Sequence, residues 1–180
     1  TLIFNGTHTT GGAYTVYFGA LLGGTGNIGS DVDLFGTIAP GDADVGTLSI
    51  GGLTLQDDAA FVFELQNTFG LHSAGVGNDL LAISGALTAG ASPPELSVII
   101  EALGGGDLNQ EGSWVLATYG SLNALSIPSF NVSGIDQTNF NYSIDIVPDS
   151  LVTPLGAGSI VLSLVPVPEP NSIVITAMGI

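Results

Sequence analysis

The chain contains no lysine and no arginine among its 180 residues, so its 16 Asp and Glu residues have no strongly basic side chain to pair with. Each carboxylate must therefore be hydrated, hydrogen-bonded or bound to a metal ion. The net charge of −16 repels nucleic acid and anionic membrane surfaces, and we expect no nucleic-acid partner. Schiff-base catalysis and P-loop phosphate binding are excluded as well, because both require a lysine.

Cysteine is also absent, which excludes disulfide bonds and thiolate metal sites. No apolar run reaches the ~20 residues that a transmembrane helix needs, so we expect no stable membrane anchor in this chain. The start lacks a basic leader, and we expect any signal peptide to have been removed or to be left out of this sequence. A hydrophobic share of 45% against 9% charged residues predicts a folded chain with a real core.

Short β-strand patterns are abundant in the sequence. Segments such as AYTVYF, AFVFEL and WVLATYG alternate apolar and polar residues and are rich in β-branched and aromatic side chains. The 27 glycines are spread along the whole chain, as expected for many tight turns. Gly85 and Gly90 argue against a helix in NDLLAISGALTAG. The sequence therefore predicts an all-β protein.

The stretch from Gly23 to Asn67 repeats a unit of strand, Gly-rich turn and strand, at a spacing that suits a coil of a β-solenoid. In such a fold each strand pairs with the strand one coil away, and apolar side chains stack inside without ion pairs. We predict a right-handed parallel β-helix, with a β-sandwich or jelly roll as the alternative. The segment after Leu125 reads more like antiparallel hairpins. The alternation assigns these residues to the interior: Val32, Leu34, Phe35, Leu48, Ile50, Leu53, Leu55, Phe61, Phe63 and Leu65.

One stretch, GGTGNIGSDVDLFGTIAPGDADVGTLSIGGLTL, resembles the right-handed β-helix repeat of autotransporter passenger domains and related exported proteins. In that family a GGTG turn precedes a short strand, an APG turn follows it, and GTLxIxGxLTL begins the next coil. The resemblance covers about Leu21 to Leu125. It implies a β-helix that functions outside the cell, and it implies little about chemistry.

The C-terminal VPVPEPNS, followed by an apolar run, resembles the PEP-CTERM sorting signal that exosortase-type membrane enzymes process. Pro168, Glu169 and Pro170 match its motif. The sequence supplies only the start of the signal's transmembrane helix and lacks its basic cluster. The resemblance implies export to the surface or surroundings of a Gram-negative-type bacterium, often alongside exopolysaccharide. A proline-terminated edge strand is the alternative interpretation.

These patterns divide the chain into three parts. We expect N-terminal strands over 1–20 that act as a cap or a strand-exchange segment, a β-solenoid body over 21–165, and a remnant of the sorting signal over 166–180. Apolar strands at a free end are edges open to pairing, and solenoid ends stack unless polar residues cap them. The residues expected to exchange strands are Leu2, Ile3, Phe4, Tyr14, Val16 and Phe18.

Two pairs of acids are the candidate metal ligands. Asp31 and Asp33 are two residues apart, as are Asp42 and Asp44, so each pair points to one side of an extended backbone. Calcium accepts carboxylate oxygens in irregular geometry, and the neighbouring GGTGNIG is faintly similar to glycine-rich calcium repeats. The competing interpretation is that these are hydrated turn carboxylates. We expect either no cofactor or calcium.

The sequence favours a structural function over catalysis. We expect a non-enzymatic surface or matrix protein that assembles into a homo-oligomer or filament by end-to-end stacking or strand addition. A carbohydrate-binding adhesin is the alternative, with Trp114 and Tyr119 as candidates for stacking on a glycan. The simplest interpretation of Trp114, which lies where a strand opens, is nevertheless a core residue. A polysaccharide-active enzyme comes third, because no particular pair among the 16 acids is singled out for acid–base chemistry.

Overall fold

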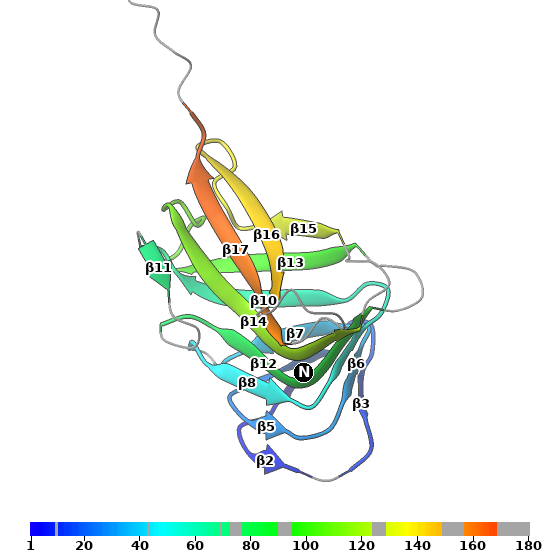
Figure 1. The fold of residues 1–180 in the computed structure, drawn as a ribbon. Coiled ribbons are helices and arrows are strands. Elements are labelled where there is room, and N and C mark those ends of the chain that lie inside the picture. The colour runs from blue at the N-terminus through cyan, green and yellow to red at the C-terminus, as the bar shows by residue number, and fades with distance from the viewer. Residues whose placement is uncertain are drawn as a thin grey trace, which may run out of the picture.

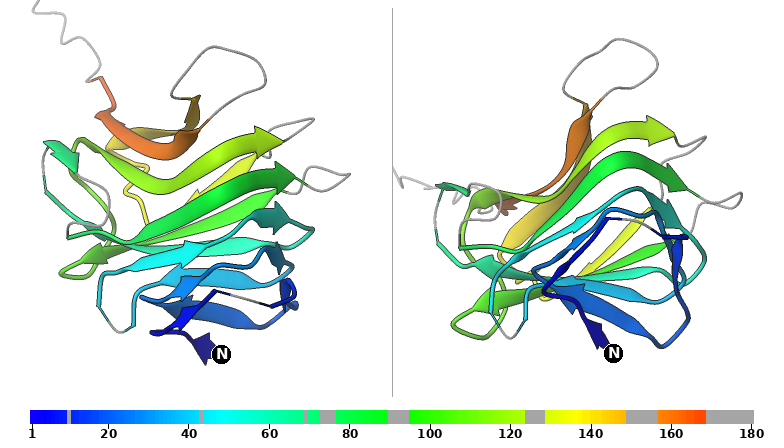
Figure 2. Two further views of the ribbon diagram at one scale, coloured as in Figure 1. Left: turned by 60° about the horizontal axis from the view of Figure 1, so that its bottom comes forward. Right: turned by 90° about the horizontal axis from the view of Figure 1, so that it is seen from below.

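The computed structural model describes residues 1–9, 11–42, 44–68, 70–72, 77–89, 95–123, 129–148 and 157–168. Throughout these ranges the regular structure is β-strand, and they include no helix that is long and apolar enough to cross a membrane. The strands wind as successive coils of a parallel β-helix, which confirms the predicted fold class (Figure 1). Seen from the N-terminal end, the first coils have a three-sided outline (Figure 2).

The first side of the solenoid is a parallel sheet of six strands, one contributed by each successive coil. Its order is β1 (Leu2–Ile3), β4 (Leu21–Gly24), β7 (Thr37–Pro40), β10 (Ala60–Gln66), β13 (Leu96–Leu103) and β15 (Phe130–Ser133). The strands β10 and β13 are longer than β1, β4 and β7. The last coil of this sheet also spans more residues than the first, because Leu2 pairs with Leu22 whereas Val98 pairs with Val132.

A second sheet covers the remaining sides. Its main path is β2 (Thr7–His8), β5 (Asn27–Ile28), β8 (Thr47–Ile50), β12 (Leu80–Ala89), β14 (Gly112–Asn123), β17 (Gly158–Pro166) and β16 (Phe140–Pro148). A parallel branch contains β3 (Tyr14–Val16), β6 (Val32–Leu34) and β9 (Leu53–Leu55), and β11 (Gly70–His72) pairs with β14. The long strand β12 joins the two paths, because its first half pairs with β8 and its second half with β9.

Glycines form the corner at which β12 and β14 bend. The Gly85 amide donates a 2.6 Å hydrogen bond to the Gly51 carbonyl, and the Gly51 amide donates to Ser30 in the coil before. A Cβ atom at Gly120 would collide with the backbone oxygen of Ser84. Successive coils can therefore turn this corner in close backbone contact only because side chains are absent there.

The core is a set of apolar ladders that run along the stack, as the alternation predicted. Of the ten residues assigned to the interior, nine are buried and Phe35 is the exception. Phe35 directly follows the inward-facing Leu34, so its side chain points to the opposite face and into solvent. One ladder on the first side is formed, in register, by Leu22, Ile38, Phe61, Val98 and Val132.

The stack ends in an antiparallel hairpin at the end opposite to the N-terminus (Figure 2). β17 runs antiparallel to β14, and β16 pairs antiparallel with β17. Ile160, Leu162 and Leu164 are buried on the inner face of this hairpin. The prediction of antiparallel hairpins after Leu125 is thus confirmed for β16 and β17, whereas β15 still continues the parallel sheet.

Candidate functional site

The N-terminal end of the solenoid leaves three strands with a free edge. Residues 1–20, expected to be a cap or a strand-exchange segment, form the first coil of the stack itself. Among the described residues, β1 pairs only with β4, β2 only with β5, and β3 only with β6. Each strand therefore has one side whose backbone groups face away from the stack, and such edges are templates for pairing with another chain.

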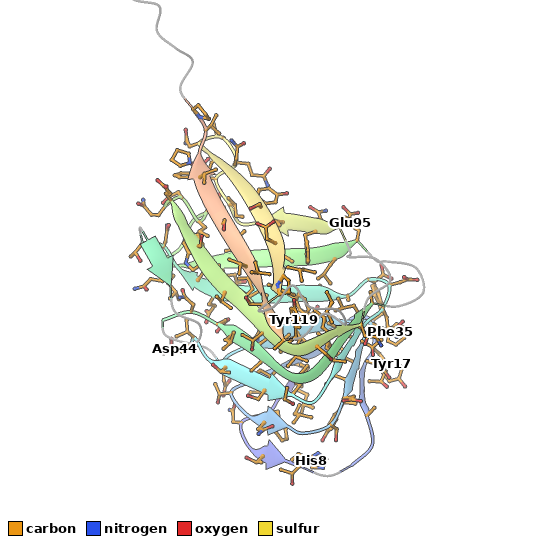
Figure 3. The ribbon with its side chains drawn as sticks, in the orientation of Figure 1. His8, Tyr17, Phe35, Asp44, Glu95 and Tyr119 are labelled. Atoms are coloured by element: carbon orange, nitrogen blue, oxygen red, sulfur yellow. The ribbon has the colours of Figure 1, made fainter. Side chains whose placement is uncertain are left out.

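Apolar side chains surround this open end. Leu2 and Ile3 on the edge strand β1 are both exposed, although they are aliphatic. An open cleft of about 210 Å³ lies beside them and is lined by Tyr14, Val16 and Leu22, among others. A 2.9 Å hydrogen bond joins Tyr14 Oη and His8 Nδ1 across this coil. Figure 3 shows His8 at the N-terminal end of the stack. Part of the core of the first coil is thus reachable from the end of the stack.

Of the residues expected to exchange strands, the structure gathers all six in this coil. Leu2 and Ile3 are exposed on the edge, and Phe4 is partly buried and packs against the core. Tyr14 and Val16 lie on β3, where Val16 is buried and therefore serves as core. Phe18 follows in the turn to β4 and is exposed.

The charge of the molecule is distributed unevenly along the stack. Residues 1–30 contain no Asp or Glu, and all 16 acids lie between Asp31 and Glu169. The first coil therefore supplies no carboxylate of its own, and Asp42 from the loop between β7 and β8 bonds to its Asn5 side chain. The opposite end carries Asp136 and Asp145 on or beside the closing hairpin, and both belong to exposed polar segments.

An exposed aromatic corner adjoins the first coil. Tyr17 is 70% and Phe18 79% exposed, and Phe35 occupies the equivalent corner of the next coil. The Phe35 amide donates to the Val16 carbonyl and the Thr37 amide donates to the Ala20 carbonyl, which holds the two turns one above the other. Figure 3 shows Tyr17 and Phe35 on the same side of the stack. Large exposed apolar groups gathered in this way mark interaction surfaces.

A second feature is a row of carboxylates near the loop between β7 and β8. Glu64 and Glu101 are direct neighbours across β10 and β13. Asp79 lies next to them with only 1% of its surface exposed, and it accepts 2.8 Å hydrogen bonds from the amides of Gly46 and Glu64. Burial raises the pKa of Asp79 to about 6, although these hydrogen bonds act in the opposite direction. Burial and the nearby charges of Glu101 and Asp44 also raise the pKa of Glu64.

The sequence did not single out Asp79, Glu64 or Glu101. The neighbouring Asn-Asp pair before a strand is a recognisable turn signal, but its burial depends on contacts with β7, β8 and β10 that lie far away in sequence. In the structure Asp79 joins two coils by its carboxylate, so its evident task is to satisfy backbone amides at a corner.

The four acids proposed as calcium ligands do not form one site. Asp33 lies on β6 and Asp31 directly precedes it, whereas Asp42 and Asp44 lie in the loop between β7 and β8. Figure 1 and Figure 3 show β6 and Asp44 on opposite sides of the stack. Asp42 accepts a 2.6 Å hydrogen bond from Asn5 Nδ2 of the first coil. Within the described residues, no three His, Asp or Glu side chains are grouped to hold a metal ion.

Trp114 and Tyr119 were candidates for glycan stacking, and their burial contradicts that assignment. Trp114 is 0% and Tyr119 3% exposed, so neither offers a ring face to a ligand. Trp114 lies inside β14 and donates a 3.0 Å hydrogen bond from Nε1 to the Gln66 carbonyl. Both side chains belong to the inward-facing set of a long strand, and they stabilise the core between coils.

Of the sorting motif, Pro168 lies in an exposed segment just after β17, and Glu169 and Pro170 fall outside the described residues. No protein-family model matches the chain, and no curated protein is significantly similar to it.

Proposed function

We propose that this chain is a non-catalytic structural protein of the bacterial surface or extracellular matrix, and that it self-associates by strand addition at the end of its solenoid. The observation that carries this proposal is the solenoid itself, whose coils stack aliphatic side chains in register and pair edge to edge through main-chain hydrogen bonds. Main-chain hydrogen bonds at such an edge supply affinity without any basic side chain.

The core chemistry suits a durable material outside the cell. Stacked aliphatic ladders such as Leu22, Ile38 and Phe61 are stabilised by burial and by backbone hydrogen bonds between coils. These forces require no disulfide bonds and no salt bridges between acids and basic side chains. They therefore suit a chain that contains no cysteine, lysine or arginine. The complete absence of Lys and Arg also removes the side chains that trypsin-like proteases bind in their specificity pocket.

We further propose that the C-terminal segment is a sorting signal of the PEP-CTERM type. Support comes from the Pro-Glu-Pro motif at Pro168 and from its position: the chain leaves the hairpin after β17 and residues 165–168 are exposed. A processing enzyme needs such an accessible, extended segment, and the folded solenoid would remain intact after cleavage there. The exported product is expected to lie in the matrix, in contact with exopolysaccharide.

Localisation in the native bacterium tests the proposed function. Cells are fractionated and labelled with an antibody against the folded chain, and the label is expected on the cell surface and in the matrix. Removal of the gene is expected to weaken the matrix while leaving growth in suspension unchanged. A protein confined to the cytoplasm, or a matrix of unchanged mechanical strength after deletion, would contradict the proposal.

A glycan-binding adhesin is the second candidate, and the exposed aromatic corner favours it. The rings of Tyr17 and Phe18 are exposed, as is that of Phe35 on the next coil. An exposed aromatic ring offers an apolar face on which a sugar ring can stack, and tyrosine adds a hydroxyl group that can form a hydrogen bond. Binding of matrix polysaccharide is measured by calorimetry for the wild type and for Tyr17→Ala and Phe18→Ala. Loss of binding in these variants alone would support the adhesin, and equal binding by all three proteins would exclude this corner.

A further inference from the structure

Three turns follow one another along the corner of the stack that carries the exposed aromatic residues. The strands on both sides of this corner are in register from coil to coil, with Val16, Leu34 and Leu55 aligned before the turns and Leu21, Thr37 and Ala60 aligned after them. The turns between these positions are residues 17–20, 35–36 and 56–59. The middle turn is therefore the shortest, and the turns on either side of it must extend farther from the stack.

The two longer turns share one backbone conformation. In each of them the amide of the fourth residue donates to the carbonyl of the first, Ala20 to Tyr17 and Ala59 to Gln56. The third residue has a positive φ, 75° at Gly19 and 65° at Asp58, as in a type II turn. Phe18 and Asp57 thus occupy equivalent positions on two turns of the same shape, and both residues are exposed.

Aromatic side chains occupy the first and the middle turn. Tyr17 and Phe18 lie on the first turn and Phe35 lies on the middle one, where 36% of its surface is exposed although a longer turn lies on either side. The backbones of these two turns are in close contact, because a Cβ atom at Gly36 would collide with the carbonyl oxygen of Tyr17. Neighbouring coils are about 4.8 Å apart, so Tyr17 and Phe35 belong to a short aromatic row along the stack (Figure 3).

Carboxylates flank this aromatic row. Asp33 lies on β6 two residues before Phe35, so both side chains point to the outer face of the stack. Asp57 and Asp58 are exposed on the next turn along the stack. The chain has no lysine or arginine, so no strongly basic side chain offsets these carboxylates. The corner therefore repels anionic ligands and attracts cationic ones.

The combination of aromatic rings and carboxylates favours a sugar that carries amino groups. Aromatic side chains offer apolar faces on which the C–H groups of a pyranose ring can pack. A carboxylate forms its strongest hydrogen bonds with a charged donor, such as the ammonium group of an amino sugar. From Tyr17 to Asp57 the three turns extend about 10 Å along the stack, which is comparable to the length of a disaccharide. A polymer of amino sugars can therefore contact the aromatic row and the carboxylates at the same time.

A lysine-rich peptide, whose ammonium groups end flexible alkyl chains, fits this corner less well. Proteins bind such cations in aromatic cages that surround the charge. The aromatic side chains of this corner lie instead in a row and are exposed. A polysaccharide repeats its rings at intervals close to the spacing of the coils, so successive sugars can meet successive turns.

We infer that the corner formed by Tyr17, Phe18, Phe35, Asp57 and Asp58 binds a polysaccharide with free amino groups, such as a polymer of glucosamine. The aromatic row holds the sugar rings, and the carboxylates bind the ammonium groups. The inference rests on the second candidate function, the glycan-binding adhesin, and it specifies the ligand and the acids that select it.

Calorimetry with the full chain tests the choice of ligand. The probes are a glucosamine oligomer, the same oligomer with acetylated amino groups, and a galacturonate oligomer of equal length. We expect the glucosamine oligomer to bind most tightly and the acetylated oligomer more weakly. The galacturonate oligomer is expected not to bind measurably, because the acids of the corner repel its carboxylates. Equal affinity for the first two oligomers, or tighter binding of the galacturonate oligomer, would overturn the inference.

Tyr17→Ala and Tyr142→Ala form a matched pair of variants for the aromatic row. Both tyrosines are exposed, and Tyr142 lies on β16, outside the corner. Tyr17→Ala is expected to raise the dissociation constant of the glucosamine oligomer by about threefold to tenfold, because stacking is lost, and Tyr142→Ala to leave it unchanged. The melting temperature verifies that both variants are folded. A folded Tyr17→Ala that binds the oligomer like the wild type would contradict the proposed site.

The acids of the corner are tested by Asp57→Asn and Asp58→Gly. Glycine adopts the positive φ of residue 58 without strain, so Asp58→Gly removes the carboxylate and keeps the turn. Each variant is expected to raise the dissociation constant of the glucosamine oligomer by about twofold to fivefold and to change that of the acetylated oligomer little. Asp107→Asn removes the same charge from an exposed position outside the corner and serves as the control. An equally large effect of Asp107→Asn would mean that the oligomer binds to charge anywhere on the molecule, against the inference.

A lysine oligomer of matched charge distinguishes a sugar from a peptide as the ligand. Its binding is expected to be insensitive to Tyr17→Ala, because it has no ring to stack on the aromatic row. A loss as large as that of the glucosamine oligomer would identify a cationic peptide as the ligand and overturn the inference. Binding of the acetylated oligomer alone, with loss in Tyr17→Ala, would overturn the inference and still support the adhesin. If no sugar binds, the inference and the adhesin are both overturned, and localisation in the matrix still decides the structural function.

Discussion

Asp79 is a buried carboxylate that bonds to two backbone amides, and its ionisation links the stability of the fold to pH. Its pKa is about 6 in the folded chain against 3.8 in the unfolded chain, so between these values the folded state binds more protons. The free energy of unfolding therefore falls as the pH rises through this window, by up to about 3 kcal/mol from this residue. Glu64 changes stability in the same direction because its pKa is raised too.

We expect the melting temperature to rise as the pH is lowered from 7 to 5. Asp79→Asn cannot ionise, so its rise over this range is expected to be clearly smaller than that of the wild type. Asp57→Asn removes the same charge from an exposed turn and serves as the control. The melting temperature of this control is expected to depend on pH as that of the wild type does. Parallel melting curves of wild type and Asp79→Asn across the range would show that Asp79 does not carry the effect.

Gly120 is required at the corner of β14 because neighbouring backbone atoms occupy the space of a side chain. Gly120→Ala would force its Cβ against the Ser84 carbonyl, and overpacking of this kind typically costs about 1–3 kcal/mol. Gly12→Ala is the matched control, because no atom lies within 4 Å of the added methyl group. Chemical denaturation measures both variants, and equal stability would mean that the corner relaxes freely.

At the scale of the element, the hairpin of β16 and β17 closes the core at the C-terminal end. Leu162 and Val165 lie on the same strand but on opposite faces, and Leu162 is buried whereas Val165 is exposed. Leu162→Ala is expected to lower the free energy of unfolding by about 2–5 kcal/mol, and Val165→Ala to change it little. Urea unfolding checks both. Similar small losses for both variants would show that the hairpin packs loosely on the stack.

The elements themselves could be predicted from the sequence because alternation and glycine-rich turns are local signals. Val32, Leu34, Leu48 and Ile50 alternate with polar residues, and the structure buries all four. Phe35 was assigned wrongly because it continues an apolar run just after the strand has placed Leu34 inside. The period of two decides the face of a residue, and apolar character alone does not.

The candidate sites were harder to predict, since they depend on contacts between distant coils. The sequence favours the core for Trp114 but leaves glycan stacking open, and the parallel pairing of β14 with β12 and β11 encloses the side chain. Asp79 becomes buried only when the loop between β7 and β8 folds over it.

At the scale of the whole molecule, apolar stacking must overcome a charge that the sequence cannot neutralise. All 16 acids lie beyond residue 30, and no Lys or Arg compensates them. Mutual repulsion is therefore concentrated among the carboxylates that follow residue 30. This uncompensated charge makes the stability of the chain sensitive to the surrounding ions.

Added calcium is expected to raise the melting temperature at neutral pH, because divalent cations screen and neutralise the unpaired carboxylates. Since Asp31 and Asp33 lie apart from Asp42 and Asp44, we expect sodium chloride at matched ionic strength to reproduce most of the effect. Calorimetric melting at several concentrations of each salt separates the two causes. A rise that saturates at about one calcium ion per chain and that sodium cannot reproduce would reveal a discrete calcium site. A melting temperature indifferent to both salts would mean that the carboxylates are too far apart to repel one another appreciably.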